Sequence, residues 1–219
     1  MSKDKDGQND LNFDIVEVDV RSWVESARAD PTRYRDRQIT EIVLTAIGLA
    51  PTLHETLVLK GGTAMALAFR SERVTGDVDF TSMADPNDLD KKLVPELNEL
   101  LPKAAIKLGY LDLLCQVQSV KKMPRPENFS EYQFPALRVK IGSAQRGTTE
   151  EARLITGKAS RVLDVEISFR DQVYNFQELN LNGAGVAVRA FTIHELVAEK
   201  FRALLQQPIR NRNRRQDVY

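Results

Sequence analysis

The chain has 219 residues, of which 42% are hydrophobic and 28% are charged, a composition of ordinary globular proteins that excludes disordered, collagen-like and membrane-embedded chains. Its length suits one compact domain, or one domain with a smaller helical appendage. Thirty-one basic and 31 acidic residues cancel, so net charge indicates no partner. The charges are unevenly spread, because residues 1–110 have 14 Lys and Arg against 19 Asp and Glu, whereas residues 111–219 have 17 against 12.

The single cysteine and the two histidines limit the metal chemistry. Cys115 cannot form an intramolecular disulfide, and its apolar neighbours predict a buried, inert thiol. His54 and His194 have no second His or Cys at ligand spacing, which argues against structural zinc. Any metal should therefore have oxygen ligands. The sequence has no signal peptide and no apolar run of the roughly 18–20 residues that span a membrane, so we expect a cytoplasmic protein without membrane contact.

The first half of the chain begins with a tail and continues with helices. Residues 1–12 should be disordered, because the first ten have no apolar residue after Met1. Apolar spacing predicts helices over 22–28 and 33–48, with Pro31 between them as a breaker or first helical residue. A buried strand over 57–59 should end at Gly61-Gly62, and a helix should follow over 63–70.

The second half alternates strands with helices. Strands are expected over 77–81, 111–120, 132–141 and 163–169, the last with one buried face. A helix is expected over 87–108, which Pro95 and Pro102 should kink or divide. Residues 142–160 read as a mobile hairpin loop that either touches a substrate or is merely solvated. The last helix should run over 193–207 and stop at Pro208.

Asp77 and Asp79 are the first residues that suggest chemistry. They lie two apart on a predicted strand, so both carboxylates leave the same face, close enough to share a hard divalent cation such as Mg²⁺. The alternative is a solvent-facing strand with a polar repeat. Asp164 and Glu166, on the polar face of the 163–169 strand, are candidates for a third carboxylate, and a solvated strand face is again the alternative.

A glycine bend precedes the acid pair. Gly61, Gly62 and Thr63 stand between a strand and a helix, where glycines permit close backbone approach and free N–H groups attract an anion. Beside an acidic pair, this bend predicts an NTP site in which the bend holds the phosphates and the acids hold their magnesium.

Lys200 is the unusual residue of the last helix. At roughly 100° per residue it falls inside the apolar stripe, away from Glu195, Glu199 and Arg202. Either its ammonium extends to water at the edge of the stripe, or the stripe ends at a cleft where the ammonium meets a carboxylate or a phosphate.

Four segments in order resemble one family. Lys60-Gly61-Gly62-Thr63-Ala64 with Arg73-x-Thr75-x-Asp77-Val78-Asp79-Phe80 resembles the first signature of the AbiEii-like nucleotidyltransferase toxins of type IV toxin–antitoxin and abortive-infection systems. The later matches are the strand 165–171 with Glu166 at an acidic position, the helix 195–201 with its lysine Lys200, and the segment 214–219 with Asp217. Gln216 stands where the family has Lys, and relatives continue beyond Tyr219, so we expect a C-terminally truncated chain.

The resemblance implies an α+β fold of the DNA polymerase β type, with a mixed sheet flanked by helices. The core should cover residues 13–190, and a helical C-terminal part should cover 191–219. It further implies NTP as substrate, Mg²⁺ as cofactor, an RNA acceptor such as the tRNA 3′ end, and a cognate antitoxin. By position, Asp77 and Asp79 become metal ligands, Lys200 becomes an NTP contact, and Asp217 becomes a further active-site acid. The mechanistic hypothesis adds Glu166 as a ligand of a second metal ion, Gly61, Gly62 and Thr63 as the residues that position the triphosphate, and Arg73 as a second cation that offsets its charge.

Three alternatives stay open at this point. The acceptor could be a small hydroxylated molecule, as in aminoglycoside-modifying relatives, with the same active site. The chain could instead be a catalytically silent module that binds a nucleotide or a protein partner. The basic stretch from Arg210 to Arg215 is either an RNA contact, whose binding should weaken steeply with salt, or a solvated helix end.

Overall fold

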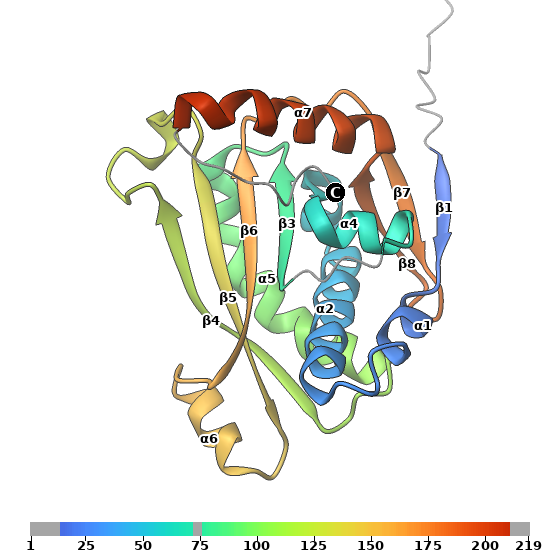
Figure 1. Ribbon diagram of the computed structural model, residues 1–219. Helices are drawn as coiled ribbons and strands as arrows, with labels where there is room; N and C mark the ends of the chain where they lie inside the picture. The colour runs from blue at the N-terminus through green and yellow to red at the C-terminus, as the bar shows by residue number, and fades with distance from the viewer. Residues whose placement is uncertain (1–13, 72–75, 211–219) are drawn as a thin grey trace, which may run out of the picture.

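An eight-stranded mixed sheet forms the centre of the fold (Figure 1). The computed structural model describes residues 14–71 and 76–210, with side chains up to residue 205. The strands are β1 (Ile15–Val18), β2 (Leu57–Lys60), β3 (Asp77–Ser82), β4 (Leu113–Met123), β5 (Ala136–Gln145), β6 (Arg161–Phe169), β7 (Phe176–Leu181) and β8 (Val186–Phe191). The helices are α1 (Val20–Glu25), α2 (Pro31–Leu49), α3 (Pro51–Thr56), α4 (Gly61–Ala68), α5 (Pro86–Lys107), η1 (Phe129–Glu131), α6 (Thr149–Ile155) and α7 (Ile193–Arg210).

The strand order is β1-β7-β8-β2-β3-β6-β5-β4. The pairs β1–β7, β2–β8 and β3–β6 are parallel, and the other neighbouring pairs are antiparallel. The predicted α+β class with a mixed sheet is therefore confirmed. The division of the chain at residues 190 and 191 stays a prediction.

Helices cover the two faces of the sheet unequally. In Figure 1, α2 and α5 lie behind the sheet, α4 lies in front near β2 and β3, and α7 crosses the upper strand ends. Every residue of α2 from Ile39 to Ile47 is buried, and α5 buries the stripe Leu89, Leu93, Leu97 and Leu101. The apolar core thus lies behind the sheet, and in this view no helix lies in front of β5 and β6 below α7.

The helix over 87–108 is present as α5, but its prolines do not divide it. Pro95 and Pro102 are both on the exposed side of one continuous helix. The buried leucine stripe on the opposite side is uninterrupted, so packing keeps the helix together where two backbone hydrogen bonds are missing.

Two further expectations were wrong. Residues 142–160 are not a mobile loop, because they contain the end of β5 and helix α6, whose Leu154 is buried. Thr148 and Glu151 stand at the spacing of a capping box, and Glu151 accepts a hydrogen bond from the backbone N–H of Gly147 at 2.7 Å. The last helix also continues past Pro208 to Arg210. The residues before Pro208 are already helical, and the proline continues their backbone instead of ending the helix.

Several elements were not predicted, namely β1, α3, β7 and β8. The β7–β8 hairpin has a readable signal: apolar residues alternate before and after Asn182-Gly183, a turn-forming pair.

Cys115 is buried, and burial raises the pKa of its thiol to about 12, as the prediction of an inert cysteine requires. The expected tail over residues 1–12 lies outside the described residues.

Candidate active site

Asp77 and Asp79 project from the same side of β3. Val78 and Phe80 alternate with them and are buried in the core, so the pleat of the strand turns both carboxylates to the opposite face. This is the shared face that the sequence predicted for the acid pair.

Strand pairing extends the acid pair into a charged row. Asp79 lies opposite Lys60 of β2 on one side and opposite Glu166 of β6 on the other. Glu166 in turn lies opposite Arg138 of β5. Directly opposed residues share a face, and neighbouring strands are about 4.8 Å apart. We refer to Lys60, Asp79, Glu166 and Arg138 as the charged row.

A second row of charges lies next to it. Asp77 is opposite Asp164, which is opposite Lys140. Arg138 Nη2 is 3.2 Å from Glu166 Oε2, and Lys140 Nζ is 3.3 Å from Asp164 Oδ1. Both candidates for a third carboxylate therefore lie beside the acid pair, and both have a half-exposed cation as partner.

The glycine bend touches Asp79. Gly61 has φ +66°, in the left-handed region, and a Cβ atom added to it would lie 2.3 Å from Asp79 Oδ2. A side chain here would be strained and would also collide with the carboxylate. The bend is the first turn of α4, which begins at Gly61 and not at Thr63, and no side chain caps that turn. Its N–H groups and helix dipole favour an anion.

Thr63 already has a partner. It is buried, and its hydroxyl donates a hydrogen bond of 3.0 Å to the carbonyl oxygen of Asp77. This bond ties α4 to the start of β3 and so fixes the distance between the bend and the acids. A phosphate contact by Thr63 stays a prediction.

Burial and like charge act together on Asp79. Burial raises the pKa of Asp79 most, the Asp77 carboxylate raises it further, and Lys60 opposes them, so that the pKa reaches about 6. A carboxyl group in this state gains from a nearby cation, because the cation removes the repulsion.

The donor set fits a magnesium ion only in part. Among the residues that the structure describes, no group of three or more His, Cys, Asp or Glu side chains is close enough to hold a metal ion. Mg²⁺ commonly takes one or two protein carboxylates and completes its shell with water and substrate phosphates. Asp77 and Asp79 suit that mode, whereas Glu166 is directed to Arg138 and its role as a metal ligand stays a prediction.

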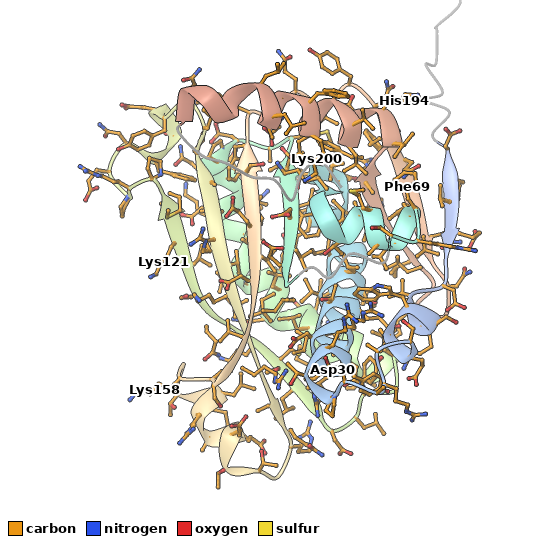
Figure 2. All side chains as sticks on the ribbon, in the orientation of Figure 1. Asp30, Phe69, Lys121, Lys158, His194 and Lys200 are labelled. Atoms are coloured by element: carbon orange, nitrogen blue, oxygen red, sulfur yellow. The ribbon has the colours of Figure 1, made fainter. Side chains whose placement is uncertain are left out.

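Lys200 lies on α7, which crosses the strand ends above β3 (Figure 2). It is partly buried and follows the buried Leu196 by one helical turn, so both side chains leave the same side of the helix. The apolar stripe is not a core face, because Ile193, Val197 and Phe201 are 40%, 45% and 62% exposed. Glu199 was expected to lie away from this side, yet its carboxylate reaches Lys60 at 3.2 Å.

Some predicted residues lie outside the described part of the chain. Arg73, Thr75 and Asp217 belong to this group, as does the basic stretch after Arg210. Conversely, sequence reasoning missed Lys60, Arg138 and Asp171. Lys60 precedes the glycine bend and Asp171 follows the 163–169 strand, but only the folded structure shows that their side chains meet.

The residues of the site together suit one class of reaction. Paired carboxylates beside the uncapped N-terminus of a helix suit a metal-assisted reaction on a phosphorylated substrate. A family model described as "Nucleotidyl transferase AbiEii toxin, Type IV TA system" matches residues 42–219. The chain belongs to this family, as its motifs predicted.

Solved structures give weaker comparisons. A putative nucleotidyltransferase from H. pylori has a TM-score of 0.47 and 17% identity, and covers 76% of this chain and 56% of that one. JHP933 from Helicobacter pylori gives 0.46 and 16%, with 76% and 54% covered. MenT4, a nucleotidyltransferase toxin from Mycobacterium tuberculosis H37Rv, gives 0.45 and 19%, with 83% and 57% covered. The chain thus spans a little over half the length of these structures.

Two other comparisons are brief. No curated protein matches the chain. Of the helices in the described ranges, none combines the length and the apolar composition that a membrane crossing requires.

The contact between Gly61 and Asp79 can be tested with alanine. Gly61→Ala should lower the free energy of unfolding by about 2–4 kcal/mol, because strain at positive φ adds to a collision with the carboxylate. Gly109→Ala is the matched control, since Gly109 has φ +79° and nothing within 4 Å of an added Cβ, and should cost about 1 kcal/mol. Urea denaturation measures both, and equal losses would contradict the close contact.

The raised pKa of Asp79 predicts a pH-dependent stability. Folding raises this pKa from 3.8 to about 6, so the metal-free fold loses stability through this group as pH rises between those values, up to about 3 kcal/mol at pH 8. Asp79→Asn should therefore raise the melting temperature at pH 8 and change it little at pH 4. Asp88→Asn, at an exposed helix position, is the control, and a melting temperature that falls at pH 8 in Asp79→Asn would refute the raised pKa.

Proposed function

We propose that this chain is a Mg²⁺-dependent nucleotidyltransferase toxin that transfers NMP from an NTP to an RNA hydroxyl, with the tRNA 3′ end as acceptor. The observation that carries the proposal is the contact between the acid pair and the glycine bend, with Asp79 against Gly61. Family membership over residues 42–219 supports the same reaction class.

The triphosphate has a binding region of suitable charge. The uncapped first turn of α4 offers N–H groups at Gly61, Gly62 and Thr63, and Lys200 adds an ammonium from α7. Arg73 is proposed as a further phosphate contact. Together these groups hold the α-phosphate near Asp77 and Asp79 and offset its negative charge.

Asp77 and Asp79 would hold the metal, with Glu166 as a candidate third ligand. Bound Mg²⁺ would neutralise phosphate charge and lower the pKa of the attacking hydroxyl. In the transfer, the acceptor oxygen bonds to the α-phosphorus while the bond to the bridging oxygen breaks, and pyrophosphate leaves with the electron pair. The hydroxyl proton passes to a carboxylate of the charged row, and Glu166 is the exposed one.

The acceptor side of the site favours a polyanion over a small molecule. Beyond Glu166, the same sheet face carries Arg138 and Lys140, and Lys121 of β4 lies opposite Arg138. Arg138 and Lys121 are exposed, and Lys140 is partly exposed. A line of cations leading to the acids suits an RNA backbone, and a small hydroxylated acceptor needs no such line. A cognate antitoxin is a further expected partner.

Incubation with labelled NTPs and total RNA tests the activity. The wild-type chain should label RNA in the presence of Mg²⁺ and lose this activity with EDTA, and Asp79→Ala should lower the rate by at least about 100-fold because a metal ligand is lost. Asp88→Ala serves as the control. No labelling by the wild type, or equal labelling by Asp79→Ala, would remove the proposal, and NTP binding without turnover would favour the silent module.

The basic line can be tested separately. Lys121→Gln with Arg138→Gln should raise the KM for RNA about tenfold in 150 mM salt and reduce the salt dependence of binding by roughly one to two charges. Arg153→Gln with Lys158→Gln removes two exposed charges near α6 (Lys121 and Lys158 are labelled in Figure 2) and should change neither value. Equal effects of the two pairs would show that the β4–β5 face has no special role and would favour a small acceptor.

A further inference from the structure

Helix α7 is attached to the sheet mainly by charge. Its exposed apolar stripe contributes little packing, and Leu196 is its one fully buried residue among those whose side chains are described. At its start, the Glu195 carboxylate accepts hydrogen bonds from the backbone N–H groups of Tyr174 and Asn175. Further along, Glu199 forms an ion pair with Lys60 of β2, and Arg202 forms one with Asp171, just after β6. Polar contacts therefore decide where this helix lies.

Lys60 is the centre of these contacts. Its Nζ is 2.8 Å from Asp171 Oδ2 and 3.2 Å from Glu199 Oε1, and its side chain is only 13% exposed. Arg202 Nη2 lies 3.7 Å from Asp171 Oδ1. We refer to Lys60, Asp171, Glu199 and Arg202 as the fastening cluster. It joins the end of β2, the segment after β6 and two successive turns of α7.

Neighbouring residues fix the position of Asp171 in the fastening cluster. Ser168 donates a hydrogen bond of 2.5 Å to the same Asp171 oxygen that Lys60 contacts. Arg170 has φ +64°, a left-handed conformation that disfavours side chains, and its guanidinium donates to the carbonyl oxygens of Tyr132 and Ser130. This turn directs Asp171 back toward β2. A strained turn that points a carboxylate at a buried ammonium indicates a fixed geometry.

The pKa shifts of Lys60 and Asp171 are those expected of closely paired charges. Burial alone would lower the pKa of Lys60, but Glu199 and Asp171 outweigh it and raise that pKa. The pKa of Asp171 is lowered although burial opposes this, because Lys60 stabilises the carboxylate. The ammonium is thus charged at neutral pH, and its partners leave it directed at α7 instead of at the acid pair opposite.

We propose that Lys60 is a positioning residue: through Glu199 and Asp171 it fixes α7 across the ends of β2 and β3 and thereby brings Lys200 to the triphosphate. The inference rests on the proposed function, because it assigns Lys200 to an NTP. Glu199 and Lys200 are adjacent on the helix, so a shift of one moves the other. Lys60 itself does not touch the substrate in this scheme.

A merely structural role for Lys60 makes a different prediction. In that case its loss would lower stability and all activities together, whatever residue stands at position 200. A positioning role acts through Lys200, so removing Lys200 first should abolish the effect of Lys60 on NTP affinity. A double-mutant cycle separates these two cases.

The experiment measures binding of MgATP and the other MgNTPs by calorimetry without RNA, together with amide hydrogen exchange of α7. Lys60→Met should weaken binding of whichever MgNTP the wild type binds by about tenfold. It should also speed amide hydrogen exchange in residues 196–202, because two carboxylates lose their buried cationic partner. Glu199→Gln, which keeps the shape of the side chain, should have a similar effect, and Lys60→Arg should restore most of the affinity. In a Lys200→Met background, Lys60→Met should change affinity less than twofold.

Lys103→Met is the matched control, because Lys103 also pairs with a glutamate, Glu99 at 2.7 Å, but on the exposed face of α5. It should leave binding and α7 exchange unchanged. An unchanged affinity in Lys60→Met, or an equal loss with and without Lys200, overturns the inference. Failure of the proposed function gives a distinct result. In that case the wild type binds MgNTP and the double-mutant cycle gives the expected affinities, but no nucleotide is transferred to RNA. A wild type that binds no MgNTP overturns both.

Discussion

The alternation of side chains along β3 is the constraint on which the site depends. Val78 and Phe80 must enter the core, so Asp77 and Asp79 must face the opposite side of the sheet. A one-residue slip would exchange the acids with the apolar pair and place two carboxylates in the core, which is prohibitively unfavourable. The hydrophobic core behind the sheet thus supplies the free energy that holds two mutually repelling acids side by side. The raised pKa of Asp79 reflects this placement, first through burial of the carboxyl group and then through repulsion by Asp77.

The local parts of this arrangement are readable from the sequence. Period-two patterns located β3 and β6, and the glycines located the bend, because each depends on residues within one short segment. The leucine stripe of α5 was equally clear, although its prolines suggested a division that packing overrides. Where patterns were overlooked, the signals were still local: the Thr148 and Glu151 spacing of α6, and the alternation around Asn182-Gly183 in β7 and β8.

The assembly of the site is a different matter, because it depends on register between distant segments. No pattern within the sequence says that Lys60 lies opposite Asp79, or that Asp171 comes back to Lys60 across 111 residues. The helical wheel of α7 gave a wrong prediction of its buried side for the same reason. It sorts residues by angle around one helix, and it took apolar residues to mark the buried side. The sheet offers α7 charged partners instead, so Glu199 turns inward and most of the stripe faces solvent.

This mode of attachment has a consequence for the chemistry. An apolar interface fixes a helix through many weak contacts that tolerate small shifts, whereas a few short, charge-assisted contacts fix it at defined atoms. Lys60 occupies the position directly across from Asp79, so the same residue that sets the place of α7 also sits beside the acid that would bind the metal. A displacement of α7 therefore cannot leave the electrostatics of Asp79 unchanged, because Lys60 lowers the pKa of that acid and Glu199 raises it. The helix that carries Lys200 and the strand that carries the acids are thus coupled through one ammonium group.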